Sequence, residues 1–195
     1  AVSDVALFGD NDVVPFDVDT KFVSDSSNEI AAALLSVGQE LGRKSKKDCK
    51  STLHGVHIFS ERLLAPVGQS GFRITTKIHP FWNLYLNALA VSLAELHEVQ
   101  RSNRAHSYRF SALGPGLFDK DASWRRFRES TLEECDEENG YQVVVQTDIS
   151  SFYDHVNHHR LENFVGDLAG GDSNFPTQID VILNQLAVGR SFGLP

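Results

Sequence analysis

The sequence contains only two cysteines, Cys49 and Cys135, among its 195 residues. Two thiols are too few for a disulfide framework, and neither has a metal-ligating partner nearby in the sequence. No apolar run approaches the ~18 residues that a transmembrane helix needs, so we expect no membrane span. The N-terminus lacks the basic and apolar regions of a signal peptide, and we therefore expect a cytoplasmic location.

Several sequence motifs are also absent. There is no G-x-S-x-G and no G-x-x-x-x-G-K-[ST], which excludes serine-hydrolase and P-loop interpretations, and there are no internal repeats. The formal charge of −8 argues against a nucleic-acid partner, because phosphates call for Lys and Arg. The basic residues are nevertheless segregated into 43–50, 101–109 and 125–128. Such runs are either solvated faces or parts of a locally basic groove.

What is present is an ordinary composition for a globular protein, with 41% apolar and 23% charged residues. Helices interspersed with a few strands predict an α+β or α/β protein. We expect the α+β class, helix-rich with a small, mainly antiparallel sheet. We expect residues 1–26 to form short strands or a loosely packed arm, and 43–50 to form a loop or frayed turn. The predicted helices are 26–42, 80–101, 119–135, 158–168 and 176–189, and the predicted strands are 56–59, 72–79 and 142–148.

The stretch QVVVQTDISSFY (142–153) contains the first candidate site. Three consecutive valines predict a central strand covered on both faces, and Asp148 follows at its carboxyl end. A carboxylate there is a hard oxygen ligand suited to Mg²⁺. The alternative is that Asp148 caps a turn, as Ser150 or Ser151 could also do.

The longer pattern around Asp148 favours metal binding over turn capping. TDISSFY followed by HHRLE closely resembles the first catalytic motif of reverse transcriptases, most strongly the bacterial branch of retrons, group II intron enzymes and abortive-infection or defence-associated enzymes. The ending GRSFGLP (189–195) resembles the start of that family's next motif, and 107–127 resembles the region that leads into the first. The resemblance covers roughly residues 70–195, and the 45 residues between Asp148 and Gly193 agree with the family's order.

The resemblance implies a role for each matching residue. Asp148 would bind the catalytic metal, with the carbonyl of Ile149 as a further contact, and two Mg²⁺ ions would serve phosphoryl transfer to a primer 3′-hydroxyl. The backbone N–H groups of Ser151 and Phe152 would hold the incoming triphosphate. Tyr153 would be the steric gate that favours deoxynucleotides, its alternative being a core aromatic. The residues expected to pack under the templating base pair are Ser191, Gly193, Leu194 and Pro195.

The resemblance further implies three regions: an N-terminal extension with the start of the fingers (1–70), the fingers (71–140) and a partial palm of a right-hand polymerase (141–195). Arg73 and Lys77 share one face of a predicted strand and are candidate triphosphate or template contacts, although a solvated face explains them equally well. The expected partners are dNTPs, an RNA template and its DNA product.

The chain departs from the family in two respects. It contains no Tyr-x-Asp-Asp pair, and Asp154 stands where many relatives carry Pro. One aspartate cannot hold two Mg²⁺ ions, so we expect this chain alone to be inactive and to need the remainder of the polymerase or an oligomeric partner. Two alternatives stay open: a non-catalytic nucleic-acid-binding or scaffolding module of the same fold, and an RNA-dependent RNA polymerase.

The histidines suggest a further, weaker hypothesis. His155, His158 and His159 are close in sequence, and histidines three apart on a helix can ligate Zn²⁺. No cysteine or carboxylate is spaced to complete a tetrahedral site, so structural roles are favoured. His54 and His57 are explained as strand or loop residues.

Overall fold

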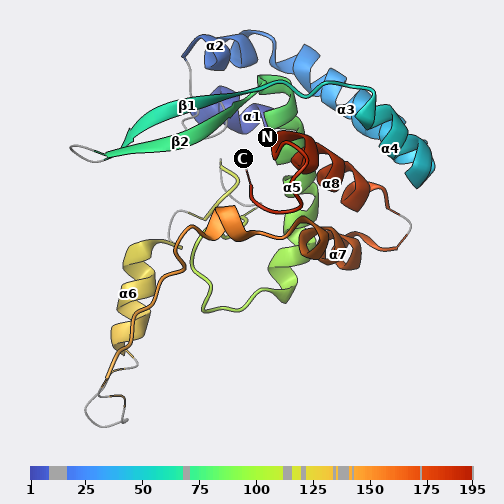
Figure 1. Cartoon of the computed structure of the whole chain (residues 1–195). Helices are drawn as coiled ribbons and strands as arrows, with labels where there is room; N and C mark the ends of the chain where they lie inside the picture. The colour runs from blue at the N-terminus through green and yellow to red at the C-terminus, as the bar shows by residue number, and fades with distance from the viewer. Residues whose placement is uncertain are drawn as a thin grey trace. The chain divides into compact units, whose positions relative to one another are not determined.

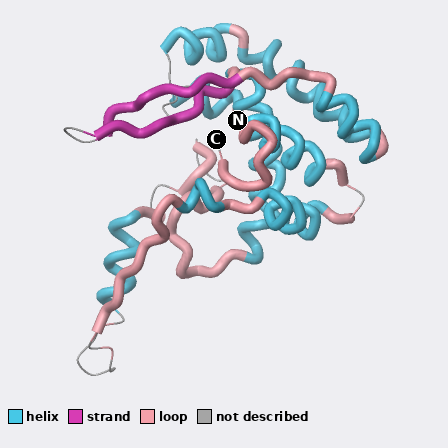
Figure 2. The backbone as a smooth tube through the Cα atoms, in the orientation of Figure 1, coloured by secondary structure: helices cyan, strands magenta, loops and turns pink. Residues whose placement is uncertain are grey.

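The computed structural model describes residues 1–8, 17–67, 71–111, 116–119, 122–133, 135, 141, 143–171 and 173–194. Within these residues the chain is helix-rich and contains one two-stranded antiparallel sheet, so the α+β class is confirmed (Figures 1 and 2). The helices are α1 (Val2–Phe8), α2 (Asp17–Asp25), α3 (Ser27–Arg43), α4 (Lys46–His54), α5 (Pro80–Gln100), α6 (Trp124–Glu133), α7 (His158–Ala169) and α8 (Phe175–Leu186), and the strands are β1 (Ser60–Val67) and β2 (Gly71–Ile78). None of the described helices is both long and apolar enough to cross a membrane.

The chain forms two compact units. The first unit contains Ala1–Leu93 and Ser151–Pro195, and the second contains Ala94–Ser150. The first therefore holds the sheet and most helices, whereas the second holds the last turns of α5 together with α6. These units do not follow the boundaries of the three functional regions expected from the sequence, which stay a prediction.

The sheet is the hairpin of β1 and β2, in which Ser60 pairs with Ile78 and Val67 with Gly71. The predicted strand at 72–79 is confirmed to within one residue. The predicted strand at 56–59 is displaced, because pairing with β2 begins at Ser60 and the preceding segment contributes only the Phe59 carbonyl, which accepts from the His79 N–H at 3.1 Å. Register with a partner, rather than apolar content, decides where a strand begins.

Two segments expected to lack helix are helical. In the basic run, Ser45 caps α4 by accepting the Asp48 N–H at 3.2 Å, and Cys49 and Leu53, one turn apart, are buried. The capping pattern S-x-x-D together with this apolar pair outweighs the run of lysines. At the N-terminus, α1 buries Val2 and Val5, which are three residues apart and so lie on one helix face. Residues 9–16 lie outside the described part.

The core of the first unit is built around α8. Its residues Val181 and Ile182 are 1% and 0% exposed, and α8 packs against α7 and α4. Leu84 and Tyr85 of α5 belong to the same hydrophobic cluster. Each fully buried aliphatic side chain of this kind contributes about 1.5–3 kcal/mol relative to exposure.

Amide side chains fix the register of α8 against the other helices. Asn174, just before α8, donates to the carbonyls of Leu41 and Lys44 at 3.0 and 2.6 Å and so satisfies the end of α3. Gln185 donates to the Leu53 carbonyl at 2.9 Å and accepts from the Ile58 N–H at 3.4 Å. Because buried polar groups are costly when unpaired, these bonds favour one placement of α8.

A third amide, Gln178, accepts a hydrogen bond of 2.6 Å from the Tyr85 hydroxyl in the buried core. Burial, followed by the nearby Cys49, raises the pKa of Tyr85 to about 12, so the phenol keeps the proton that it donates. Gln178 is only 3% exposed and therefore has no ready access to water as a substitute partner.

We predict that Tyr85→Phe lowers the free energy of unfolding by about 1–3 kcal/mol, because it leaves the buried Gln178 oxygen without its donor. Urea unfolding monitored by circular dichroism measures this change. Tyr141→Phe is the matched control, since Tyr141 is 67% exposed and its substitution should leave stability within about 0.5 kcal/mol. Equal stabilities of the two variants would contradict the prediction.

Candidate functional site

Residues 143–149 form an extended chain that pairs with no strand among the described residues. The predicted central strand at 142–148 is therefore wrong over 143–148, and Gln142 lies outside the described part. Val143, Val144 and Val145 are 77%, 53% and 80% exposed, so neither face is covered. The physical reason is that a strand needs hydrogen-bonding partners, which an apolar run cannot supply by itself.

Asp148 is exposed at the end of this extended segment, in the second unit. Its Oδ1 accepts a hydrogen bond of 2.9 Å from the backbone N–H of Ile149. This bond comes from the next residue, whereas a side chain that caps a turn accepts from an N–H two or three residues on, so both interpretations of Asp148 stay predictions. Within the described part of the chain, no other donor is recorded for Asp148, so its second carboxylate oxygen is available to solvent or to a ligand.

The turn that follows belongs to the first unit. Ser151 has a φ of +51°, a left-handed conformation, and its carbonyl accepts from the Asp154 N–H at 2.9 Å. Phe152–His155 then form one 3₁₀ turn. Phe152 and Tyr153 are 52% and 62% exposed, and their rings meet edge to face at 5.4 Å. Tyr153 is therefore an exposed aromatic rather than a core aromatic.

The segment 153–158 pairs with the segment 191–194, and we call this pairing the loop ladder. The Leu194 N–H donates to the Tyr153 carbonyl at 2.8 Å, the Gly193 N–H to Val156 at 2.9 Å, and the His158 N–H to Ser191 at 3.0 Å. Asn157 and Phe192 form an antiparallel bridge between the two segments. The structure thus brings Tyr153, Ser191, Gly193 and Leu194 together, whereas Pro195 lies outside the described residues.

His158 ties the loop ladder together with its side chain. It is 2% exposed, and its Nε2–H can donate to the Gly193 carbonyl, 2.6 Å away. Its Nδ1 is buried and has no hydrogen-bond partner among the described residues. Asn157, one residue earlier, caps α7 by accepting the Arg160 N–H at 3.0 Å. The start of α7 is therefore fastened to the 191–194 segment by both backbone and imidazole.

Gly193 occupies a position that other residues adopt only with strain. Its φ is +90°, and a Cβ built there would meet the carbonyl oxygen of Asp154 at 3.4 Å. The positive φ is therefore the main reason why glycine suits this position, where the chain turns back beside the 3₁₀ turn. The backbone conformation thus explains why a glycine stands in the GLP sequence, which the sequence pattern alone did not reveal.

The two predicted fingers residues lie on β2. Lys77 forms an ion pair of 3.5 Å with Asp19 of α2, and both side chains line a cavity of about 770 Å³ that also contacts Phe81. Arg73 is paired with Ala65 in the hairpin, but the placement of its side chain lies outside what the structure describes. Lys77 is therefore already engaged by a carboxylate of the N-terminal region.

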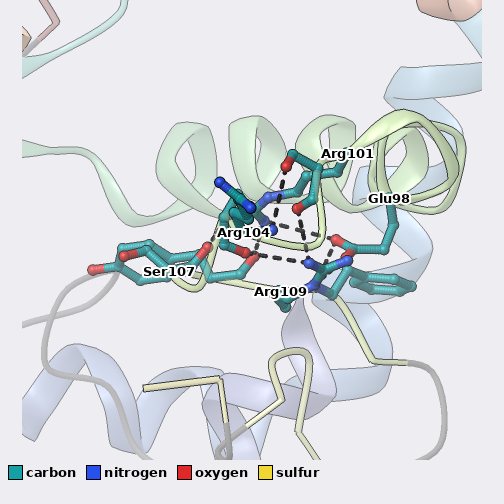
Figure 3. Close-up of polar contacts among 9 residues, drawn as sticks. Glu98, Arg101, Arg104, Ser107 and Arg109 are labelled. Carbon is teal, nitrogen blue, oxygen red and sulfur yellow. Dashed lines mark hydrogen bonds and ion pairs between the residues drawn. The ribbon is translucent and has the colours of Figure 1, made fainter. Parts of the chain in front are cut away.

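A cluster that the sequence analysis did not predict closes the loop after α5 (Figure 3). The Oε1 atom of Glu98 lies 2.6 Å from both Nε and Nη2 of Arg109, and Oε2 accepts the Phe110 N–H at 3.2 Å. Arg101 lies 3.7 Å from the same carboxylate and also donates to the carbonyls of Ser107 and Tyr108. We call this cluster the arginine clasp. The i,i+3 spacing of Glu98, in the last turn of α5, and Arg101, the residue after α5, was the sign of this cluster in the sequence.

The electrostatics of the clasp favour the charged form of Glu98. Partial burial acts to raise the pKa of its carboxyl, but the backbone N–H of Phe110 and the positive charges of Arg109 and Arg101 outweigh it. The pKa of Glu98 is consequently held below its ordinary value of 4.5.

No metal centre is formed by protein side chains within the described ranges, since no three His, Cys, Asp or Glu residues come together there. His155 and His159 are exposed, and His159 Nδ1 lies 3.4 Å from Glu162 Oε2. His158 is used within the loop ladder instead. The histidines that are close in sequence are thus given separate roles by the fold.

Comparison with known proteins found no matching family model, no matching curated protein and no matching solved structure.

We predict that His158→Ala weakens the loop ladder, because the Gly193 carbonyl loses its donor in a buried place. The expected loss is about 1–3 kcal/mol of stability, with faster amide exchange at Gly193 and Leu194. Hydrogen exchange followed by NMR measures both amides. His159→Ala is the control, since that neighbouring side chain is 76% exposed. Identical exchange rates at Gly193 in the two variants would show that the imidazole does not hold the ladder.

We also predict that Glu98→Gln loosens the loop 101–110 and accelerates tryptic cleavage there at neutral pH. Glu95→Gln, an exposed neighbour on α5, should not. Because the folded-state pKa of Glu98 is lowered, its contribution to stability is present above pH 4.5 and is lost as the pH falls through the lowered value. The stability difference between wild type and Glu98→Gln, measured by urea unfolding, should therefore shrink with acid. A difference that grows with acid would contradict this sign.

Proposed function

We propose that this chain is the fingers and first palm segment of a bacterial RNA-directed DNA polymerase of the retron, abortive-infection or defence-associated type. Its function would be to help add deoxynucleotides to a primer 3′-hydroxyl on an RNA template, in the cytoplasm and in antiphage defence. The remainder of the polymerase or an oligomeric partner would supply the second acidic pair. The observation that carries the proposal is the loop ladder.

The loop ladder supports the proposal because it joins the two sequence motifs independently of the resemblance. Tyr153 and Leu194 are 41 residues apart, yet a 2.8 Å backbone bond connects them. In a polymerase, the loop under the templating base pair has to lie beside the turn that receives the nucleotide. A direct bond between these two segments is what such a site requires, and the exposed ring of Tyr153 is free to contact a sugar.

The residues present also fit a divalent metal in part. Asp148 offers one carboxylate oxygen beyond the one that accepts the Ile149 N–H, and the Ile149 carbonyl is a second hard oxygen. Mg²⁺ prefers oxygen ligands of this kind. Bound there, Mg²⁺ would supply charge neutralisation for phosphoryl transfer. Within this chain, Asp148 would hold and orient the metal ion, and Ser151 and Phe152 would present their backbone N–H groups to the triphosphate. Tyr153 would exclude a nucleotide with a 2′-hydroxyl.

Two observations favour the non-catalytic alternative. Asp148 Oδ1 accepts the Ile149 N–H, and Lys77 is paired with Asp19. A nucleic-acid-binding or scaffolding module of the same fold would need neither residue for catalysis. An RNA-dependent RNA polymerase is distinguished at Tyr153, since that enzyme would have to accept ribonucleotides there.

We predict that Asp148→Ala, made in the longest natural protein that contains this sequence, lowers dNTP incorporation on a primed RNA template at least about a hundredfold. Even outer-sphere partners of metal ligands are worth about 10–100-fold. Primer extension measures the rate. Asp154→Ala is the matched control, because it removes an exposed carboxylate from the same turn and should retain activity.

Undiminished incorporation by Asp148→Ala would rule out the enzyme and favour the non-catalytic module. Incorporation of rNTPs as efficiently as dNTPs by the unaltered protein would favour the RNA polymerase. Circular dichroism of both variants checks that the fold is retained.

A further inference from the structure

The first unit contains a cavity of about 770 Å³ that is lined by residues of α2, α3, β1, β2 and α5. The lining includes Val23 and Leu84, which are 0% and 1% exposed, so part of the cavity wall is the hydrophobic core itself. Small-molecule sites commonly enclose about 300–1,000 Å³ and combine an apolar wall with a few polar groups. A ligand with a small apolar body therefore fits both the volume and the wall.

Three phenylalanine rings also line this space, which we call the aromatic cavity. Phe22 and Phe59 are 60% and 50% exposed, so a ligand can reach them from solvent. The ring of Phe81 is stacked with that of the buried Tyr85, with centroids 6.3 Å apart and an interplanar angle of 8°. An aromatic face attracts a cation that lies within about 6 Å of the ring centroid. The rings therefore add an attraction for positive charge to the apolar wall.

Carboxylates outnumber cations in the lining of the aromatic cavity. Asp19, Glu29 and Glu61 supply three acidic groups, whereas Lys77 is the one Lys or Arg among the described residues of the lining. Lys77 lies 3.5 Å from Asp19. Glu61 is opposite Lys77 in the hairpin, yet within the described ranges neither Glu61 nor Glu29 has a cation within ion-pair distance. Two carboxylates consequently stay uncompensated.

The histidine in the lining does not change this balance. Nδ1 of His79 accepts a hydrogen bond of 3.3 Å from the backbone N–H of Phe81. A ring nitrogen that accepts a hydrogen bond carries no proton, so the imidazole is neutral while this contact holds. No three His, Cys, Asp or Glu side chains in the part of the chain that the structure describes come together as metal ligands would. The excess negative charge of the cavity therefore favours an organic cation over a bare metal ion.

We propose that the aromatic cavity binds a small organic ammonium ion, namely a primary amine on an aryl or alkyl stem. The stem packs on the apolar wall, and the charge lies against the phenylalanine rings and is attracted by Glu29 and Glu61. Burial of the stem gains free energy from the hydrophobic effect. The cation–π and Coulomb attractions set the ammonium ion apart from a neutral molecule of the same shape. The inference goes beyond the proposed function, because neither Asp148 nor a nucleotide takes part in it.

The test compares three ligands that share a phenyl ring and differ in charge: phenethylamine, 2-phenylethanol and 3-phenylpropionate. Each is titrated at neutral pH and low salt, without magnesium or nucleotides. Amide shifts followed by NMR measure the affinity and show whether the residues of the lining respond. Phenethylamine should bind about 5- to 30-fold more tightly than the alcohol. The carboxylate should bind most weakly, because it meets uncompensated negative charge.

Two variants separate the contribution of charge from that of shape. Glu29→Gln combined with Glu61→Gln should lower the affinity for phenethylamine about 2- to 30-fold, since two charge attractions are lost. The affinity of this double variant for 2-phenylethanol should stay within about twofold of the parent value, which checks that the cavity is intact. Phe59→Leu keeps an apolar side chain but removes a ring face. It should weaken phenethylamine binding about 2- to 30-fold and more than it weakens binding of the alcohol.

Glu40→Gln is the matched control, because Glu40 also lies on α3 but is not among the residues that line the cavity. This variant should bind all three ligands as the parent protein does. Equal affinities of the parent protein for the amine and the alcohol, or parent-like amine binding by the double variant, would overturn the proposal. No saturable binding of phenethylamine up to about 10 mM would overturn it as well. Because no primer, template or nucleotide is present, the outcome is independent of whether the polymerase proposal holds.

Discussion

The placement of α8 by three buried or half-buried amides is the constraint on which the first unit depends. Asn174, Gln178 and Gln185 each bond a group on a different helix or at its end, so a shift of α8 by one turn would leave several polar groups unpaired at once. The apolar packing of Ile182 supplies free energy but tolerates many registers, whereas directional bonds select one. Residues 187–194 leave directly from this fixed helix. The register of the loop ladder is therefore inherited from the core.

The loop ladder and the arginine clasp have a similar structural role in the two units, since each holds a turn that carries an exposed aromatic residue. In each, an exposed aromatic sits on a turn with a residue at positive φ, Ser151 beside Tyr153 in one case and Tyr108 itself in the other. In each, a hydrogen bond to the backbone carbonyl of the aromatic residue holds it, from the Leu194 N–H to Tyr153 in the ladder and from Arg101 to Tyr108 in the clasp. Strained turns persist only where neighbours over-determine them, and such places are commonly binding sites.

Sequence reasoning succeeded where one local signal was enough. The long helix α5 follows from Pro80 and a broad apolar face, and α3 and α7 likewise lie within two residues of their predicted ends. It failed over 143–148 because three consecutive valines predict a buried strand, but the pattern does not show which strand would pair with them. It also did not foresee that His158 binds Gly193, since a contact between residues 35 apart depends on how α8 packs. The pairing of 153–158 with 191–194 likewise could not be read from the sequence and needed the fold.

Asp148 uses only one of its two carboxylate oxygens for a hydrogen bond within the described part of the chain. A carboxylate has two oxygens, and the Ile149 N–H engages Oδ1 alone. That bond restrains the side chain close to the backbone of the turn, so the entropy that a ligand would otherwise have to remove is already lost. On the proposed function, the remaining oxygen would be a metal ligand. Because one aspartate cannot hold two Mg²⁺ ions, further carboxylates would then have to come from the remainder of the polymerase or from an oligomeric partner.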